Sequence, residues 1–215
     1  MTEKSIGELE FLRKLQRLLA EGDFVATYKF ALLNALADLS LERDPAADGS
    51  LRIPVSAIAE KFLDGYRAVL RDHQGGRCLY CGKELRGAGC VDHFIAWSRY
   101  PVDLGHNFVL AHDACNAKKR DFLAYPAHLE RWQRSHLERA SELGQRFALL
   151  ALPHDSERSR AIAWWAYEQG EAAGAHAWID ADRFVRLGSS WRDALGAGGG
   201  LRRVAEPSAP DYRLE

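Results

Sequence analysis

The sequence lacks any apolar run of about 18 residues, the length that a transmembrane helix needs, so we expect no membrane-spanning segment. Its first ten residues, MTEKSIGELE, lack the basic and apolar regions of a secretory signal, which makes a cytoplasmic location the default expectation. An excess of charge of one sign is also missing, because 29 basic residues stand against 30 acidic ones. This balance argues against a protein that coats itself in nucleic acid through bulk charge, although it leaves room for a local basic site.

Cysteine is scarce, with four residues in 215, so the positions of these residues matter more than their number. Two pairs share a two-residue spacing and one cysteine stands alone: Cys78 with Cys81, His112 with Cys115, and Cys90. In a cytosolic chain, a C-x-x-C pair followed by turn residues favours a metal over a disulfide. A thioredoxin-like interpretation is weak, because no regular alternation of strands and helices surrounds the pair.

The two pairs together supply four nitrogen and sulfur ligands, the number that a closed tetrahedral zinc site requires. A zinc ion would also tie together a loop-rich segment of small apolar content. The sequence therefore predicts a structural Zn²⁺ held by Cys78, Cys81, His112 and Cys115. The alternative is two unrelated pairs in a buried core. Cys90 has no paired partner and is most simply a buried thiol.

The N-terminal third, residues 1–75, has the pattern of a helical region. Apolar residues recur at three- and four-residue steps over 5–20, then from Asp23 to about Ser40, and again after Pro54. Such stripes are typical of helices that pack on a core, and we assign them no chemistry.

Residues 76–125 differ from their flanks, because their regular stretches are short and are separated by glycines. Strand-like runs occupy 90–97 and 107–111, and a helix is expected to begin near Asp113. This segment contains every residue to which we assign chemistry.

After Pro126 the helical pattern returns, with helices expected over 127–143 and 156–171 in a C-terminal helical region at 126–195. Residues 196–215 have the composition of a loose tail. The chain as a whole is thus predicted to be an α+β protein that is mostly helical.

Asp92 and His93 stand side by side in VDHFIAWSRY, a run that otherwise reads as a strand. Titratable groups are costly to bury in such a run without partners. The stretches CLYC, VDHFIAWSRYP, HNFVL and HDACNAKK follow one another over about 76–122. In this order they resemble the HNH endonuclease family, whose outline is C-x-x-C, D-H, N, and C-x-x-C-H/N-x-x-K.

The resemblance implies a small zinc-stabilised ββα-metal core within the helical protein, and it implies roles for single residues. His93 would be the general base, and Asp92 and Asn116 would hold a catalytic Mg²⁺ or Mn²⁺. Asn107 would keep the loop and ring of His93 in place. Asn116 stands where many family members have histidine, and an amide oxygen favours Mg²⁺ over softer metals.

The basic stretch AKKRD follows the metal pair, and the resemblance implies that Lys118, Lys119 and Arg120 contact phosphate. A mere solvated helix face is the alternative. Among the other histidines, His106 is expected at the surface or behind the site. We expect His73, His128 and His136 to be exposed to solvent.

Three functions remain open: a metal-dependent nuclease acting on DNA, a non-catalytic zinc module that binds nucleic acid, and a scaffold for protein interactions. The resemblance favours the nuclease. It also suggests an antiviral defence or restriction setting and a protein partner in a defence complex. Because the net charge is near zero, such a partner could supply much of the DNA affinity.

Overall fold

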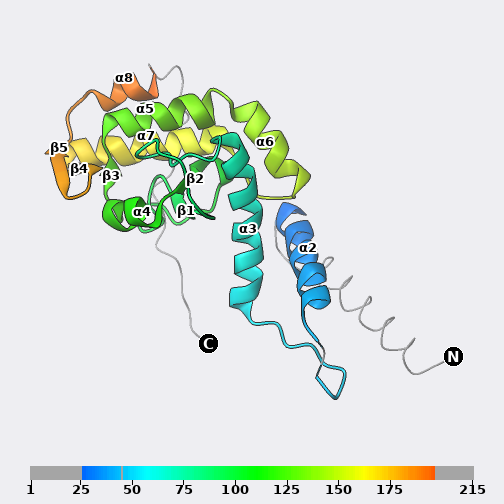
Figure 1. The fold of residues 1–215 in the computed structure, drawn as a ribbon. Coiled ribbons are helices and arrows are strands. Elements are labelled where there is room, and N and C mark those ends of the chain that lie inside the picture. The colour runs from blue at the N-terminus through cyan, green and yellow to red at the C-terminus, as the bar shows by residue number, and fades with distance from the viewer. Residues whose placement is uncertain (1–25, 45, 197–215) are drawn as a thin grey trace, which may run out of the picture. The chain divides into compact units, whose positions relative to one another are not determined.

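The computed structural model describes residues 26–44 and 46–196, with only the backbone for 26–30 (Figure 1). The chain is an α+β protein, as predicted, and it divides into two compact units between Phe62 and Leu63. The helix expected over 5–20 lies outside the described residues, and so does the tail expected over 196–215, apart from its first residue.

Two helices that the sequence predicted contribute to the first unit: α2 spans Ala26–Glu42, and α3 spans Val55–His73 and continues into the second unit. Small and apolar side chains at four-residue spacing, Ala31, Ala35 and Leu39, are buried along one face of α2. The division within α3 means that the first unit ends well before residue 75, where we had expected the N-terminal region to end.

Two antiparallel strands and a short helix form the centre of the second unit. Strand β1 (Cys90–His93) pairs with β2 (Phe108–Ala111), and α4 (Asp113–Lys119) follows β2 after one residue. The strand predicted over 90–97 ends early, because the amide side chain of Asn107 hydrogen-bonds the main-chain N–H and carbonyl of Ile95. Those main-chain groups are therefore taken by a side chain where a strand would have used them for pairing.

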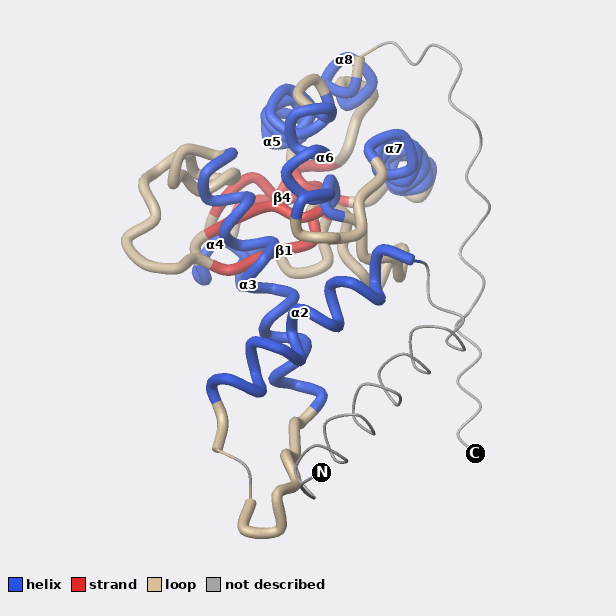
Figure 2. The backbone as a smooth tube through the Cα atoms, turned by 90° about the vertical axis from the view of Figure 1, so that its right-hand side faces the viewer, coloured by secondary structure: helices blue, strands red, loops and turns tan. Residues whose placement is uncertain are grey.

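A second, three-stranded sheet adds two strands to the region at 126–195 that the sequence predicted as helical. Strand β3 (Leu123–Ala124) pairs in parallel with β4 (His176–Asp180), which pairs antiparallel with β5 (Arg183–Arg186). All four residues of β5 are exposed, and their order in the sequence, RFVR, does not alternate between apolar and polar residues as a half-buried strand would. Figure 2 shows the strands of both sheets inside the second unit, with α4, α5 and α7 around them.

The helix predicted over 127–143 is broken into three elements: α5 (Pro126–Trp132), the π-helical turn η2 (Gln133–Leu137) and α6 (Ala140–Leu149). The hydroxyl of Ser135 donates to the main-chain carbonyl of Arg131 and lies 2.6 Å from Nδ1 of His136. Such back-bonding competes with the regular helical ladder and accompanies a local change of pitch.

Two further helices complete the described chain: α7 (Ser156–Ala172), close to its predicted bounds, and α8 (Trp191–Leu195). Within the core of this unit, the ring of Trp132 stacks on Phe94 with centroids 4.7 Å apart. Its indole nitrogen donates to the carbonyl of His106. The helices and the loop after β1 therefore share one core.

The expectation that His73, His128 and His136 are exposed was wrong, because all three are buried, as is His106. Three of them satisfy one ring nitrogen on a main-chain carbonyl: His73 on Ser135, His106 on Ala140 and His128 on Ile179. Burial lowers the pKa of each of the four imidazoles, most strongly for His136. A histidine on an otherwise polar helix face gives no sequence signal of this burial.

Candidate metal centre and polar cluster

Three cysteines and one histidine converge in the second unit. Cys78 and Cys81 lie on the loop between α3 and β1, His112 directly follows β2, and Cys115 lies in the first turn of α4. One ligand atom from each residue lies within 4.8 Å of all the others. The group that the sequence spacing predicted can therefore hold a single metal ion.

The imidazole of His112 is oriented by a main-chain contact. Its Nδ1 lies 3.3 Å from Sγ of Cys81 and 4.0 Å from Sγ of Cys115. Its Nε2 lies 3.0 Å from the carbonyl oxygen of Glu84, which can accept a hydrogen bond only from a protonated Nε2. The lone pair of Nδ1 therefore faces the sulfur atoms, as in histidines that bind zinc.

The spacing and the chemistry of the cluster fit zinc. Bonds of about 2.3 Å to sulfur and about 2.1 Å to nitrogen place the ligand atoms of a tetrahedral site roughly 3.5–3.8 Å apart. Burial, together with the neighbouring Cys78 and Cys81, raises the pKa of the Cys115 thiol to about 12. A divalent cation reverses this effect, because a coordinating thiol is deprotonated.

The turn that carries the first pair is closed by main-chain hydrogen bonds. The N–H of Gly82 donates to the carbonyl of Cys78, and the N–H of Cys78 donates to the carbonyl of Lys83, each at 2.9 Å. Gly82 has a φ of 71°, a left-handed conformation that favours glycine. The N–H of Leu79 donates to the carbonyl of Leu110, which fixes the turn to β2.

A second polar cluster surrounds the carboxylate of Asp92, whose side chain is 11% exposed. Its Oδ2 accepts a hydrogen bond of 2.5 Å from the hydroxyl of Tyr80 and lies 3.3 Å from Nζ of Lys119. Because Tyr80 lies between the two cysteines of the turn, its hydroxyl links the group of candidate metal ligands to Asp92. Sequence reasoning missed Tyr80, whose only signal was a hydroxyl-bearing aromatic between two expected ligands.

The sequence resemblance implied that Lys119 contacts phosphate, but the structure places this lysine inside the protein. Its side chain is fully buried, and its ammonium group donates to the carbonyl of His93 at 2.9 Å. Burial lowers the pKa of Lys119, and the charge of Asp92 opposes this shift. In this conformation Lys119 belongs to the Asp92 cluster and does not form part of the surface.

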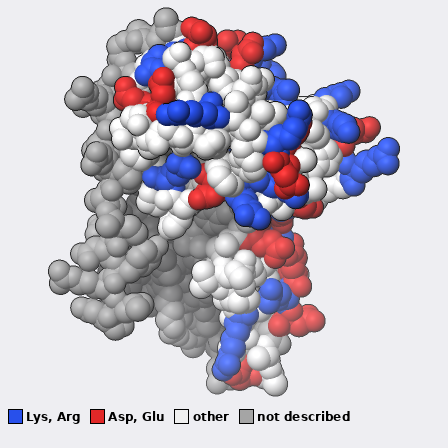
Figure 3. Space-filling model, turned by 90° about the vertical axis from the view of Figure 1, so that its left-hand side faces the viewer, with Lys and Arg blue, Asp and Glu red and all other residues white. Residues whose placement is uncertain are grey.

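Lys118 and Arg120, the other two basic residues of the predicted phosphate site, do lie at the surface. The ammonium of Lys118 is half exposed and pairs with Asp182 at 2.6 Å, and Arg120 is exposed at the C-terminal end of α4. On the face shown in Figure 3, lysine and arginine side chains are interspersed with acidic ones. The surface drawn there agrees with the near-zero net charge of the chain.

His93 lies on β1 next to Asp92, and its ring makes its own contacts. Its Nε2 lies 2.8 Å from Oδ1 of Asp103, and the ring packs edge-on against Phe108 with centroids 4.5 Å apart. The side chain of His93 is a quarter exposed, and that of Asp103 is about half exposed. Nothing in the sequence indicated Asp103, because a loop separates the two residues and no motif includes both.

Asn107 fixes the loop that follows His93. Its Oδ1 accepts from the N–H of Ile95 and its Nδ2 donates to the carbonyl of Ile95, both at 2.9 Å. The main-chain carbonyl of Asn107 accepts from the N–H of Phe94. These contacts hold the chain directly after His93 in a single conformation.

Asn116 lies one turn before Lys119 on α4, and its side chain is near the thiol of Cys90. Burial raises the pKa of Cys90 to about 11, so the thiol is neutral at physiological pH. Cys90 and Asp92 are two residues apart on β1, so their side chains lie on the same face of the strand. Asn116 is therefore on the side of α4 that faces the Asp92 cluster.

Comparison with known proteins gives one match: a family model described as a domain of unknown function, DUF8808, covers residues 8–77. The match ends directly before Cys78 and includes none of the residues of the two clusters. No curated protein and no solved structure matches the chain. Over the part of the chain that the structure describes, no helix combines the length and apolar character that a bilayer span requires.

Proposed function

We propose that the protein is a metal-dependent endonuclease of the HNH type that hydrolyses phosphodiester bonds in DNA. The observation that carries the proposal is the convergence of polar groups around β1, where Asp92 meets Tyr80 and Lys119 while His93 meets Asp103. A structural zinc site needs none of these groups as ligands, and Asp92 and Lys119 are buried as a pair, which avoids the large cost of burying either charge alone. The β1–β2 pair followed by α4 also agrees with the order of elements that the family resemblance implies.

His93 would act as the general base. The carboxylate of Asp103 accepts a hydrogen bond from Nε2–H, so in the neutral imidazole the lone pair lies on Nδ1, which can take a proton from the attacking water. Asp103 would also stabilise the imidazolium that then forms, so it acts as a positioning residue. Asn107 supports this arrangement by fixing the backbone beyond His93.

Asp92 and Asn116 would hold the catalytic divalent ion. Carboxylate and amide oxygens suit hard cations such as Mg²⁺ or Mn²⁺. When bound, such an ion supplies positive charge against the charge that develops on the phosphate and on the departing 3′ oxygen. The neutral thiol of Cys90 beside Asn116 adds no competing charge to this oxygen donor set.

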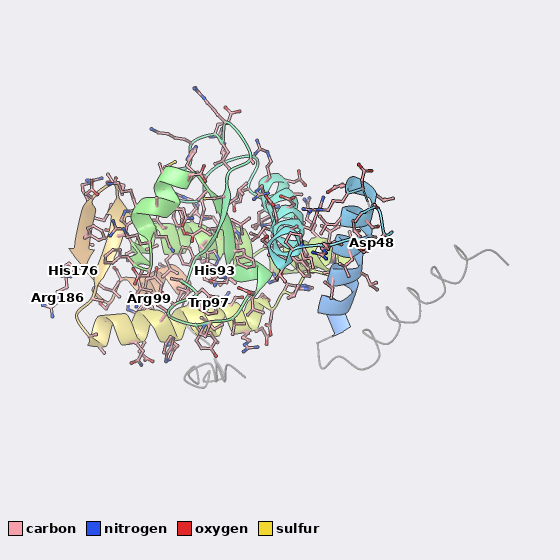
Figure 4. The ribbon with its side chains drawn as sticks, turned by 90° about the horizontal axis from the view of Figure 1, so that it is seen from below. Asp48, His93, Trp97, Arg99, His176 and Arg186 are labelled. Atoms are coloured by element: carbon pink, nitrogen blue, oxygen red, sulfur yellow. The ribbon has the colours of Figure 1, made fainter. Side chains whose placement is uncertain are left out.

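The substrate would approach from the exposed side of His93. Trp97 is 43% exposed, and it follows His93 on the loop after β1, as does Arg99; all three are labelled in Figure 4. An exposed indole offers a surface on which a base can stack, while Lys118 and Arg120 offer charges to phosphates. Because these charges are few, we expect DNA affinity to be modest and to fall with added salt.

The second candidate is a zinc module without catalytic activity that binds nucleic acid or a protein partner. The interspersed surface charges and the near-zero net charge favour it, because neither attracts DNA strongly (Figure 3). The defence or restriction setting and a protein partner rest on the family resemblance alone.

Nicking of supercoiled plasmid by zinc-loaded protein separates these candidates. We expect cleavage with Mg²⁺ or Mn²⁺, and its loss in EDTA under conditions that leave the zinc content unchanged. His93→Ala should keep zinc and melting temperature but cut at least about 10²-fold more slowly, because it removes a general base from a partly exposed position. His176→Ala, which removes an exposed histidine on β4, should cut at the parental rate. Equal cleavage by His93→Ala and the parent would refute the nuclease proposal.

A further inference from the structure

A fully buried lysine next to a carboxylate is unusual, because charged side chains are rarely buried unless they are paired. Lys119 has no exposed side-chain surface, and its Nζ lies 3.3 Å from Oδ2 of Asp92. The same nitrogen donates to the carbonyl of His93 at 2.9 Å and lies 3.4 Å from the carbonyl of Arg120. It also stands over the ring of Tyr80, 5.8 Å from the centroid.

The two oxygens of Asp92 differ in their surroundings. The described polar contacts of this carboxylate, with the hydroxyl of Tyr80 and the ammonium of Lys119, both use Oδ2. Oδ1 is therefore the oxygen that remains for a divalent ion. Any ion that binds there comes close to the ammonium group, and like charges at such a distance repel each other strongly away from bulk water.

We propose that Lys119 is an internal cation that competes with the divalent ion for Asp92 and so sets the affinity of the site for Mg²⁺ or Mn²⁺. This inference rests on the proposed function, because it takes Asp92 as a ligand of that ion. Without a divalent ion, Lys119 neutralises the carboxylate and keeps it oriented toward α4. The site then carries no unpaired buried charge, whose cost would otherwise be large.

The surroundings of Lys119 allow its ammonium group to move away from Asp92 without leaving the site. The carbonyls of His93 and Arg120 already lie within reach of Nζ, so the ammonium can shift toward them when Asp92 takes an ion. The hydroxyl of Tyr80 remains on Oδ2 and keeps the carboxylate in place. Because Tyr80 belongs to the zinc-binding turn, the orientation of Asp92 depends on an intact turn.

The test measures Mn²⁺ affinity of zinc-loaded protein by the electron paramagnetic resonance signal of free Mn²⁺. Lys119→Met removes the charge but keeps an unbranched apolar stem, and it should bind Mn²⁺ at least about tenfold more tightly than the parent. Lys118→Met is the matched control, with the same change one residue away at a half-exposed position, and should stay within about twofold. Equal or weaker Mn²⁺ binding by a folded, zinc-containing Lys119→Met would overturn the inference.

A second measurement on the parent protein applies if Lys119→Met does not fold. In nuclear magnetic resonance spectra, the chemical shift of the Lys119 ammonium nitrogen should change on titration with Mg²⁺, while that of Lys118 should not. A Lys119 signal that stays unchanged at saturating Mg²⁺ would overturn the inference.

Asp92→Asn separates this inference from the proposed function. If Asp92→Asn and the parent bind Mn²⁺ equally, the assignment of Asp92 as an ion ligand fails, and with it the proposed ion site. If Asp92→Asn weakens binding but Lys119→Met does not strengthen it, only the role of Lys119 fails.

Discussion

His93 and Asp103 make the contact on which the proposed chemistry depends most directly at the scale of single residues. The 2.8 Å contact between Nε2 and Oδ1 selects the tautomer of the imidazole that is protonated on Nε2. An ionised carboxylate can accept a hydrogen bond but cannot donate one. An asparagine at the same position could present either its oxygen or its NH₂ group to the ring. The ring of His93 would then no longer be held in the tautomer that keeps the lone pair on Nδ1, although the fold would stay the same.

We therefore expect Asp103→Asn to lower kcat for plasmid cleavage by about tenfold or more, with little change in KM. The effect should be smaller than for His93→Ala, because Asp103 is half exposed and water can replace part of its interaction. Mn²⁺ affinity should not change, since Asp103 is no ligand. Asp182→Asn, which alters an exposed carboxylate paired with Lys118, serves as the control and should cut at the parental rate. A normal kcat in Asp103→Asn would show that His93 is positioned by other contacts.

The turn that carries Cys78 and Cys81 is the element whose loss should affect the fold itself. It connects α3 to β1, and the hydrogen bond from Leu79 to Leu110 ties it to β2. The turn also carries Tyr80, so its conformation reaches the Asp92 cluster directly. Since the segment has few apolar residues of its own, the free energy of metal binding is also free energy of folding.

Cys81→Ser should therefore lose zinc, melt at a lower temperature and lose cleavage activity together. Metal analysis and thermal unfolding followed by circular dichroism measure the first two effects. Cys90→Ser is the matched control, because Cys90 lies outside the four-residue cluster and should leave the zinc content intact. Zinc retained at the parental level in Cys81→Ser would contradict the four-ligand assignment.

At the scale of the whole molecule, buried histidines make stability depend on pH. His73 and His136 pack edge to face with ring centroids 5.5 Å apart, and His106 lies near His154 at 5.8 Å. Burial lowers the pKa of His73, His106 and His136, so they stay neutral in the folded state below the pH at which they gain protons when unfolded. The charges of Arg139 and Arg146 act in the same direction on His73, while Glu142 opposes them.

The free energy of unfolding should therefore be highest above about pH 6.5 and fall as the pH drops below it. Each such histidine contributes up to about 1.4 kcal/mol per pH unit, because the unfolded chain then binds a proton that the folded chain does not. Chemical denaturation between pH 7.5 and 5 measures the slope, with zinc release followed in parallel. His73→Gln should make the slope shallower, whereas His176→Gln, at an exposed position, should not. An unchanged slope in folded His73→Gln would exclude this role for His73.

Parts of this protein were predictable because their signals are local. Helical periodicity located α2, α3 and α7, and the two-residue spacing of cysteine and histidine located the metal ligands. The predicted strands were correct in place, but the one over 90–97 was too long. Periodicity cannot show that the side chain of Asn107 hydrogen-bonds the main chain of Ile95.

The sequence alone determined which residues form the metal cluster and which stretches favour helix, since both follow from residue spacing along the chain. Only the tertiary structure decided which groups surround Asp92 and His93. Tyr80, Asp103 and Lys119 reach them across loops or between elements, and packing determines which way each side chain points. The parallel pairing of β3 with β4 is of the same kind, because it joins strands about fifty residues apart whose short sequences carry no pattern of their own.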